Sequence, residues 1–390
     1  MMVIALMLVG TLCLLAALHP FTTYPWSLIV LEALRPARPP GAARPPGAAT
    51  STAEPLSCAV CVCAYNEERV IARKVENLLA LRAEDPDLEI LIYVDGAGDR
   101  TADILRSYGN AIDLHVSSER HGKTHGMNLL AARTQSSLLI FTDANVLMDP
   151  HCVRHLRRHF EDPEIGCVSG TLLYTNPGES ITAAAGSAYW RFEEAVKRLE
   201  MGTGSVVGAD GSLFAIRRSL HRAPPPHIID DLYVSLRILC EGHRVVQASD
   251  VRAYEESVSS AREEFRRKVR IACQAFNVHR LLWPELRRLD PLTLYKYVSH
   301  KLIRWFTVYL LAAAALAFDG ALIAAGHAGI AAALAAGAAA ALLLGARSSW
   351  PPLAQLTEIL AAFAGTGVGI WRSLRGERYQ TWTPAGSIRK

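Results

Sequence analysis

Long apolar stretches lie near both ends of the chain and flank a central region of mixed polarity. Residues 1–18 contain no charged side chain, and the apolar character resumes over residues 26–34. Because about 20 helical residues cover the hydrocarbon core of a bilayer, this pattern predicts a retained membrane anchor over residues 1–34. A cleaved signal peptide is the alternative, and the absence of a basic segment before the apolar run argues against it.

The charges around this anchor predict its orientation. Three arginines follow the apolar stretch and none precedes it: Arg35, Arg38 and Arg44. By the positive-inside rule, the N-terminus then lies outside the membrane, and the chain that follows begins in the cytoplasm.

A second apolar stretch, residues 305–346, has Asp319 and His327 as its only ionisable side chains. Its length suits two helices of about 20 residues joined by a tight turn, so we expect a membrane hairpin within residues 291–346. Basic residues stand on both sides of it, namely Lys301, Arg304 and Arg347. Both ends of the hairpin are therefore expected on the cytoplasmic side.

A third apolar stretch, residues 353–371, has a higher polar content than the other two. It carries Glu358 and a glycine-rich run at residues 365–369, and a basic tail follows it. A helix that crossed the bilayer here would export that basic tail. Residues 347–390 are therefore expected to form an interfacial or re-entrant helix and a basic tail, with a crossing helix as the alternative.

The segment after the anchor has the composition of a linker. Residues 35–55 are dominated by Pro, Ala, Gly and Arg, and the sequence RPPGAA occurs twice in succession. Such a segment cannot bury a core, so it is expected to be extended and mobile. Residues 56–290 then have the composition of a globular domain.

The first half of this domain alternates between two hydrophobic patterns. Short apolar runs predict strands, and apolar residues at helical spacing predict helices between them. The expected strands are 56–63, 88–94, 112–116 and 137–142, and the expected helices are 67–81, 101–107 and 123–133. This alternation predicts an α/β domain with a mostly parallel, Rossmann-like sheet. Ligands are then expected at the carboxyl ends of the strands.

Composition narrows the range of function classes. The chain has 41 Lys and Arg against 37 Asp and Glu, and a net charge of +4 is too small to indicate a nucleic-acid partner. Half of the residues (51%) are apolar, which excludes a disordered chain. Cys58 and Cys61 have the spacing of zinc ligands, but they lie in an apolar strand and no second ligand cluster follows.

Polar or glycine-rich residues follow each of the four expected strands. Asp95 comes after the second strand and could accept a hydrogen bond from a nucleoside, and Lys123 begins a helix and suits a phosphate. Asp143 and Asn145 follow the fourth strand, and their oxygens suit a hard cation such as Mg²⁺ or Mn²⁺. Together these residues predict a nucleotide diphosphate held through a metal. Taken singly, each is also typical of a turn or a helix cap.

The second half of the domain adds two candidate features. Asp230 and Asp231 open a helix, where carboxylates either cap the helix or act as a general base and its partner. A basic helix over residues 263–275 precedes the hairpin. It either contacts anionic lipid headgroups or turns Arg267 or Arg270 toward a diphosphate.

Seven segments in order resemble family 2 glycosyltransferases, in particular the membrane-embedded group that includes cellulose, hyaluronan and poly-N-acetylglucosamine synthases. The segments are AYNEE, DGAGDRT, RHGKTHGMN, FTDAN, GADGSLFAIRR, IDDLYVSLRI and RRKVRI, and the C-terminal TWTPAGSIR is similar to a W-P-x-x-R ending. The resemblance covers about residues 57–305 and the layout of the apolar segments.

This resemblance implies a cytosolic domain of GT-A fold, flanked by membrane helices, that uses a UDP-sugar. The nucleotide would be bound by Ala64, Tyr65, Glu67, Asp95, Lys123 and Asp143, and the diphosphate or acceptor by Gly208, Asp210, Arg267 and Arg270. Asp143 and Asn145 would hold the metal as the D-x-D motif. Asp231, with Asp230 in the position of the family's Glu, would deprotonate the acceptor hydroxyl for an inverting attack.

The sequence departs from the family pattern at three places. Asn145 replaces the second Asp of D-x-D, and Ala97-Gly98 replaces the usual Ser-Thr. The Q-x-x-R-W motif of processive enzymes is reduced to Arg270, without the tryptophan that would stack on the acceptor sugar. The neutral Asn145 weakens the electrostatic hold on the metal. The missing tryptophan argues against processive polymer synthesis.

The sequence therefore predicts an inverting glycosyltransferase in a bacterial inner membrane, with its catalytic domain in the cytoplasm. Its expected partners are a UDP-sugar, a glycan or lipid acceptor and membrane lipid, with a role in surface polysaccharide synthesis and no nucleic acid. The alternatives are a nucleotidyltransferase and a non-catalytic scaffold that binds sugar nucleotides.

Overall fold

The computed structural model describes residues 1–34, 56–175, 181–256, 260–348 and 350–383. The linker expected at residues 35–55 lies outside this part of the chain, and so does the end of the basic tail, residues 384–390.

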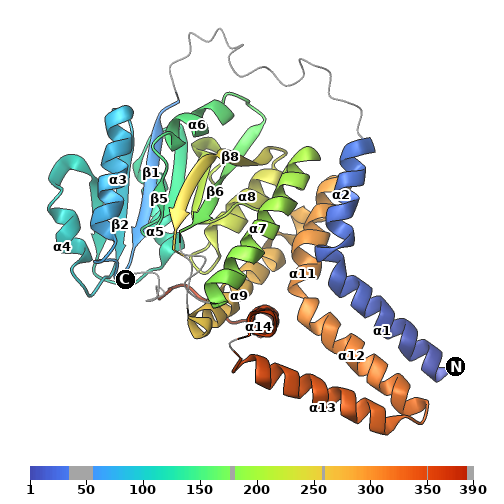
Figure 1. Cartoon of the computed structure of the whole chain (residues 1–390). Helices are drawn as coiled ribbons and strands as arrows, with labels where there is room; N and C mark the ends of the chain where they lie inside the picture. Colours follow the sequence, from blue (N-terminus) through green and yellow to red (C-terminus); the bar gives the residue numbers. More distant parts are fainter. Residues whose placement is uncertain (35–55, 176–180, 257–259, 349, 384–390) are drawn as a thin grey trace.

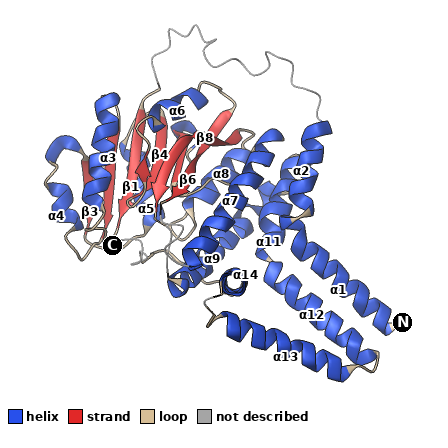
Figure 2. Cartoon of the chain, viewed as in Figure 1, coloured by secondary structure: helices blue, strands red, loops and turns tan. Residues whose placement is uncertain are grey.

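One eight-stranded sheet forms the centre of the α/β domain (Figure 2). Its strands lie in the order β3 (Asp113–Ser117), β2 (Glu89–Asp95), β1 (Cys58–Ala64), β4 (Leu138–Asp143), β7 (Leu213–Arg217), β6 (Ile165–Tyr174), β8 (Arg244–Glu255) and β5 (Leu147–Met148). The first four are parallel, as the sequence predicts. β7 is antiparallel to both of its neighbours, β6 and β8 are parallel, and β5 is antiparallel to β8. The sheet is therefore mixed, and the predicted parallel arrangement is correct for β1 to β4.

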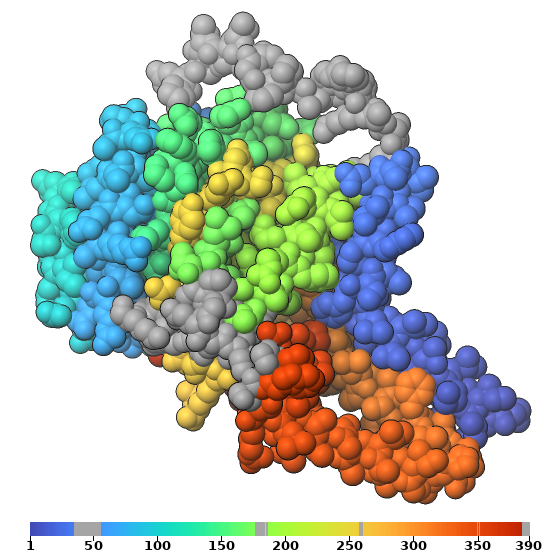
Figure 3. All heavy atoms as spheres, in the orientation of Figure 1, coloured from blue at the N-terminus to red at the C-terminus, as the bar shows by residue number. Residues whose placement is uncertain are grey.

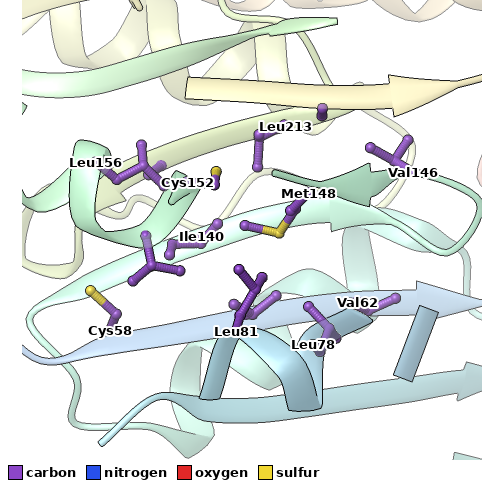
Figure 4. Close-up of a cluster of buried hydrophobic side chains, with 14 of the residues drawn as sticks. Cys58, Val62, Leu78, Leu81, Ile140, Val146, Met148, Cys152, Leu156 and Leu213 are labelled. Atoms are coloured by element: carbon purple, nitrogen blue, oxygen red, sulfur yellow. The ribbon is translucent and has the colours of Figure 1, made fainter. Parts of the chain in front are cut away.

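Helices cover both faces of the sheet because successive side chains of a strand point to opposite faces. In β1, Cys58, Val60 and Val62 pack against α3 (Ile71–Glu84), α4 (Thr101–Arg106) and α6 (Cys152–His159), as Figure 4 shows in part. Cys61 and Cys63 face the opposite side, with α5 (Lys123–Arg133), α8 (Asp230–Cys240) and α9 (Ala261–Leu286). Cys58 and Cys61 are thus buried among apolar side chains on opposite faces of the sheet, so they do not face one common ligand.

The apolar stretches form helices that project from the α/β domain (Figure 3). They are α1 (Met2–Leu18), α12 (Thr307–Ala324), α13 (Ala328–Gly345) and α14 (Pro351–Leu374). Each contains a segment long and apolar enough to cross a membrane. α1 packs along α12, and a Cβ added to Gly10 would lie 2.7 Å from the ring of Phe318, so a glycine permits this close contact.

The last of these helices differs in orientation. Figure 1 shows α14 nearly end-on, whereas α1, α12 and α13 are seen lengthwise. α14 is one continuous helix that packs against α9 and α7 (Ile181–Gly202) of the α/β domain. Its placement at or in the membrane, whether interfacial, re-entrant or crossing, stays a prediction.

A buried ionic network joins the α/β domain to the segments that lead into the membrane helices. His300 lies between two carboxylates of α7, with Nδ1 2.7 Å from Glu200 and Nε2 2.9 Å from Glu193. Tyr24 of α2 (Thr23–Leu34) donates to Glu200 at 2.5 Å, and Arg304 pairs with Glu193. Burial alone would raise the pKa of Glu193, but His300 and the nearby cations hold that pKa well below its usual range. Glu193 is therefore ionised, and the network joins three separate segments of the chain.

Candidate active site

The candidate site is a cavity of about 850 Å³ at the carboxyl ends of β1 and β4. Most of the predicted site residues line it, namely Glu67, Lys123, Asp143, Asn145, Asp210, Asp230, Asp231, Arg267 and Arg270. The other four, Ala64, Tyr65, Asp95 and Gly208, are not among its lining residues. The rest of the wall includes aromatic and basic residues of α7, α9 and α14, so the cavity extends from the sheet toward the apolar helices.

Lys123 and Asp143 form an ion pair at the sheet edge of this cavity. Lys123 opens α5, which packs against β1 and β2, and Asp143 ends β4, the strand paired with β1. Lys123 Nζ donates to Asp143 Oδ1 at 2.6 Å. Burial would lower the pKa of Lys123, but Asp143, Asp230 and Asp231 raise it above its usual value. A permanent cation is therefore held where the predicted diphosphate would lie.

Two adjacent carboxylates face the same cavity from the N-terminus of α8. Asp230 is 6% exposed, and within the described part of the chain its Oδ2 has no hydrogen-bond partner. Asp231 Oδ1 accepts from the Leu232 amide at 2.7 Å. Burial and the neighbouring Asp230 raise the pKa of Asp231 above its usual range, which suits a general base.

Glycines allow the loop before β7 to approach this pair. A Cβ added to Gly211 would lie 2.7 Å from Asp231 Oδ2. Gly208 has a φ of 92°, which side chains rarely adopt, and a Cβ there would contact Leu232 at 3.1 Å. Gly208 therefore shapes the loop behind the site, while the neighbouring Asp210 reaches the cavity.

Asp95 occupies a structural position in this conformation. It is fully buried and accepts hydrogen bonds from the backbone amides of His121 at 2.6 Å and Gly122 at 3.0 Å. It therefore fixes the loop that leads into Lys123. Its predicted contact with the nucleotide stays a prediction.

Asn145 contacts a residue that the sequence analysis did not select. Its Nδ2 donates to Glu255 Oε1 at 2.8 Å, and both residues line the cavity. Burial raises the pKa of Glu255 to about 7, with a further contribution from Asp143 and opposition from Arg267. Glu255 ends β8, a strand that the sequence analysis did not predict, so its position beside the D-x-N segment could not be anticipated.

The residues present fit a hard divalent cation in part. Asp143 and Asn145 offer carboxylate and amide oxygens on one cavity wall, which suits Mg²⁺ or Mn²⁺. In the described part of the chain, no group of three or more His, Cys, Asp or Glu side chains is arranged to hold a metal. A cation here would therefore depend on ligands from a bound diphosphate as well.

Two arginines of α9 complete the wall opposite the sheet. Arg267 pairs with Glu264 at 3.3 Å, which raises the pKa of Arg267. Arg270 donates to Gln274 at 3.1 Å, and burial beside Arg267 lowers its pKa to about 10. Both arginines stay charged at neutral pH, so they can bind a diphosphate or an anionic acceptor.

The chain after α14 returns to the cavity, where Tyr379, Gln380 and Trp382 form part of its lining. Gln274 of α9 donates to the Tyr379 carbonyl at 2.8 Å, and Gln380 donates to the His121 carbonyl at 3.0 Å. The Trp382 ring lies 6.0 Å from the ring of Tyr65, and the Arg120 guanidinium stacks on Tyr65 at 3.4 Å. Sequence reasoning marked this ending as a motif without assigning it to the site.

Comparisons with known proteins show which family and fold the chain is similar to. Residues 59–223 match the family model for glycosyl transferase family 2. The poly-beta-1,6-N-acetyl-D-glucosamine synthase of Staphylococcus epidermidis is 23% identical over 161 residues, 40% of this chain and 38% of that protein. The N-acetylglucosaminyltransferase of Rhizobium meliloti is 23% identical over 262 residues, 62% of this chain and 61% of that protein. The chain thus spans less than two thirds of either relative.

A solved structure resembles almost the whole chain. The mannosyltransferase PcManGT from Pyrobaculum calidifontis, in complex with GDP-Man and Mn²⁺, aligns with 95% of this chain and 99% of its own. The TM-score is 0.70 and the sequence identity is 22%, so the likeness concerns the fold. It confirms the predicted GT-A fold.

Proposed function

We propose that this chain, which contains a family 2 glycosyltransferase domain, transfers a sugar from a UDP-sugar to a hydroxyl group of a glycan or lipid. The observation that carries the proposal is one cavity with the Lys123–Asp143 pair on the sheet side and Asp231 on α8. A donor diphosphate and an acceptor hydroxyl need these two kinds of group on the same cavity.

Each residue has a distinct part in this reaction. Lys123, with Arg267 or Arg270, neutralises the diphosphate, and Asp143 and Asn145 would hold Mg²⁺ or Mn²⁺ against it. The cation supplies charge stabilisation for the departing UDP. Asp231 takes the proton from the acceptor hydroxyl, whose oxygen attacks the anomeric carbon from the face opposite the leaving group. The product therefore has inverted anomeric configuration.

The membrane environment favours an acceptor that approaches from the bilayer side. The cavity wall continues from Asp231 to Phe265 of α9 and to Val368 of α14, and α14 is itself one of the apolar helices. The basic residues that flank these segments favour a cytoplasmic catalytic domain in a bacterial inner membrane. A role in surface polysaccharide synthesis is consistent with the relatives named as N-acetylglucosaminyl transferring enzymes.

The test is release of nucleoside diphosphate by the membrane-embedded protein with Mg²⁺ or Mn²⁺. The donors offered are a panel of UDP-sugars and GDP-mannose, since the PcManGT complex contains GDP-Man. We expect UDP from one UDP-sugar. Asp231→Asn should reduce this rate at least about a hundredfold, because it removes the general base.

The control is Asp113→Asn, which changes a carboxylate on the edge strand β3 that pairs with Arg133. It should keep the rate. Release of GDP alone would overturn the UDP assignment. Release of pyrophosphate from a nucleoside triphosphate would favour a nucleotidyltransferase, and binding of UDP without turnover would favour a scaffold.

A further inference from the structure

The metal motif of this chain lacks one negative charge where the family pattern has a second aspartate. Asn145 stands in that position, and an amide binds a hard cation through its oxygen without contributing charge. A carboxylate from another strand lies against it, because Asn145 Nδ2 and Glu255 Oε1 are 2.8 Å apart.

The chemistry of this contact sets the orientation of the amide. Asn145 Nδ2 donates to Glu255 Oε1, so the NH₂ group of the amide faces Glu255 and its oxygen is left for another partner. Among the described residues, none of the hydrogen bonds occupies Asn145 Oδ1, which is the atom that can bind a cation. Glu255 is itself fixed, since its carbonyl accepts from the Thr175 amide at 3.0 Å and its strand pairs with β6.

The surroundings favour a role in charge as well as in orientation. Glu255 lines the same cavity as Asp143 and Asp210, and it lies near enough to Arg267 for the two charges to interact. Burying a carboxylate costs free energy unless polar groups compensate it, and Glu255 lies among polar and charged residues of the cavity wall.

We propose that Glu255 is a positioning residue that supplies the charge missing from the metal motif and turns the oxygen of Asn145 toward the cation. In this chain the amide comes from the loop after β4, and the carboxylate beside it comes from the end of β8. This inference rests on the proposed use of a divalent metal with a nucleotide diphosphate.

The test measures Mn²⁺ binding directly, by electron paramagnetic resonance of the full-length protein in detergent with UDP present. Glu255→Gln keeps the size of the side chain and an acceptor oxygen for Asn145, but removes the charge. We expect about tenfold weaker Mn²⁺ binding, the lower end of the range for outer-shell partners of metal ligands. Glu256→Gln removes the same charge one residue away, without a described contact to Asn145, and should weaken binding less.

A double variant that moves the carboxylate from position 255 to position 145 tests the proposal more strictly. Asn145→Asp alone puts two carboxylates in contact, so it should lower the midpoint of thermal unfolding without metal. Combining it with Glu255→Gln should recover that midpoint and bring Mn²⁺ affinity back to within about threefold of the unchanged protein, since small residual differences in ligand orientation are expected.

The possible failures are distinguishable. If the unchanged protein binds no Mn²⁺ in the presence of UDP, the proposed metal use fails and this inference fails with it. If the unchanged protein binds Mn²⁺ and Glu255→Gln binds it equally well, Glu255 has no role toward the metal. Failure of the double variant to recover affinity would overturn the proposed charge-supplying role of Glu255.

Discussion

At the scale of single residues, Asp231 makes the reaction depend on pH. Its pKa is raised above the usual aspartate range by burial and by Asp230. A general base must be unprotonated, so activity should rise as pH increases through this raised pKa. We expect kcat/KM to increase with pH, and the midpoint of this increase should lie well above the ordinary aspartate pKa of about 3.9.

The measurement is kcat/KM over a range from about pH 5 to pH 9. Glu255 has a pKa raised to about 7 and could produce a similar increase. The two are separated by Glu255→Gln, which should lower the rate but keep the increase with pH if Asp231 is its source. A rate that does not change with pH over this range would contradict the assignment of Asp231 as the base.

Several site residues could be predicted from the sequence because the strands near them were predicted correctly. Lys123, Asp143 and Asp231 were expected at one site, and the structure places them on one cavity. Glu255 was missed because β8 has no clear sequence signal, and its place beside Asn145 depends on a non-local strand pairing. Trp382 was missed as a site residue because its contact with Tyr65 depends on the path of the chain after α14.

At the scale of elements, the contact between α14 and α9 depends on glycines. A Cβ at Gly369 would lie 2.4 Å from the Val269 carbonyl oxygen, and one at Gly365 would lie 3.3 Å from Phe265 and Lys268. These glycines are four residues apart and so lie on one face of the helix. The glycine-rich run, which the sequence analysis noted without a role, permits close packing against the catalytic domain.

Gly369→Val should therefore separate the two helices and destabilise the protein by about 1–3 kcal/mol, as overpacking of a core does. The measurement is the temperature at which the detergent-solubilised protein loses half of its activity. Gly337→Ala in α13 is the control, because a Cβ there meets no atom within 4 Å. Equal thermal inactivation of the two variants would refute the role of Gly369 in packing.

The predicted elements and the observed ones differ mainly where local signals are weak. The helix expected at residues 67–81 begins later, at Ile71, since Asn66 adopts a φ of 53° in the turn before it. The short α6 and the strands β5, β6 and β8 were not predicted. They are defined by pairing and packing with distant segments rather than by their own periodicity.

At the scale of the whole molecule, the ionic network around His300 connects the anchor, the catalytic domain and the hairpin. His300 separates Glu193 from Glu200, and both carboxylates are buried. His300→Ala would leave these carboxylates without that partner. Removing one partner of a buried charge pair costs about 3–5 kcal/mol, so we expect a large decrease in thermal stability.

The control for this prediction is His327→Ala, at the exposed turn between α12 and α13. Thermal unfolding followed by circular dichroism in detergent measures both variants. A midpoint for His300→Ala equal to that of the control would show that the network does not stabilise the junction. Because Glu200 also accepts from the Val207 amide at 3.0 Å, next to Gly208, loss of activity should accompany unfolding.

The return of the chain to the cavity has a consequence for biogenesis. Arg120 donates to the carbonyl of Trp382, which lies 262 residues further along the chain and beyond the four apolar helices of the described residues. This contact beside the cavity can therefore form only after those helices have been synthesised. If the cavity binds a nucleotide sugar as proposed, a chain that ends before Trp382 would carry the sheet and its carboxylates without this contact, and we expect it to bind the donor more weakly.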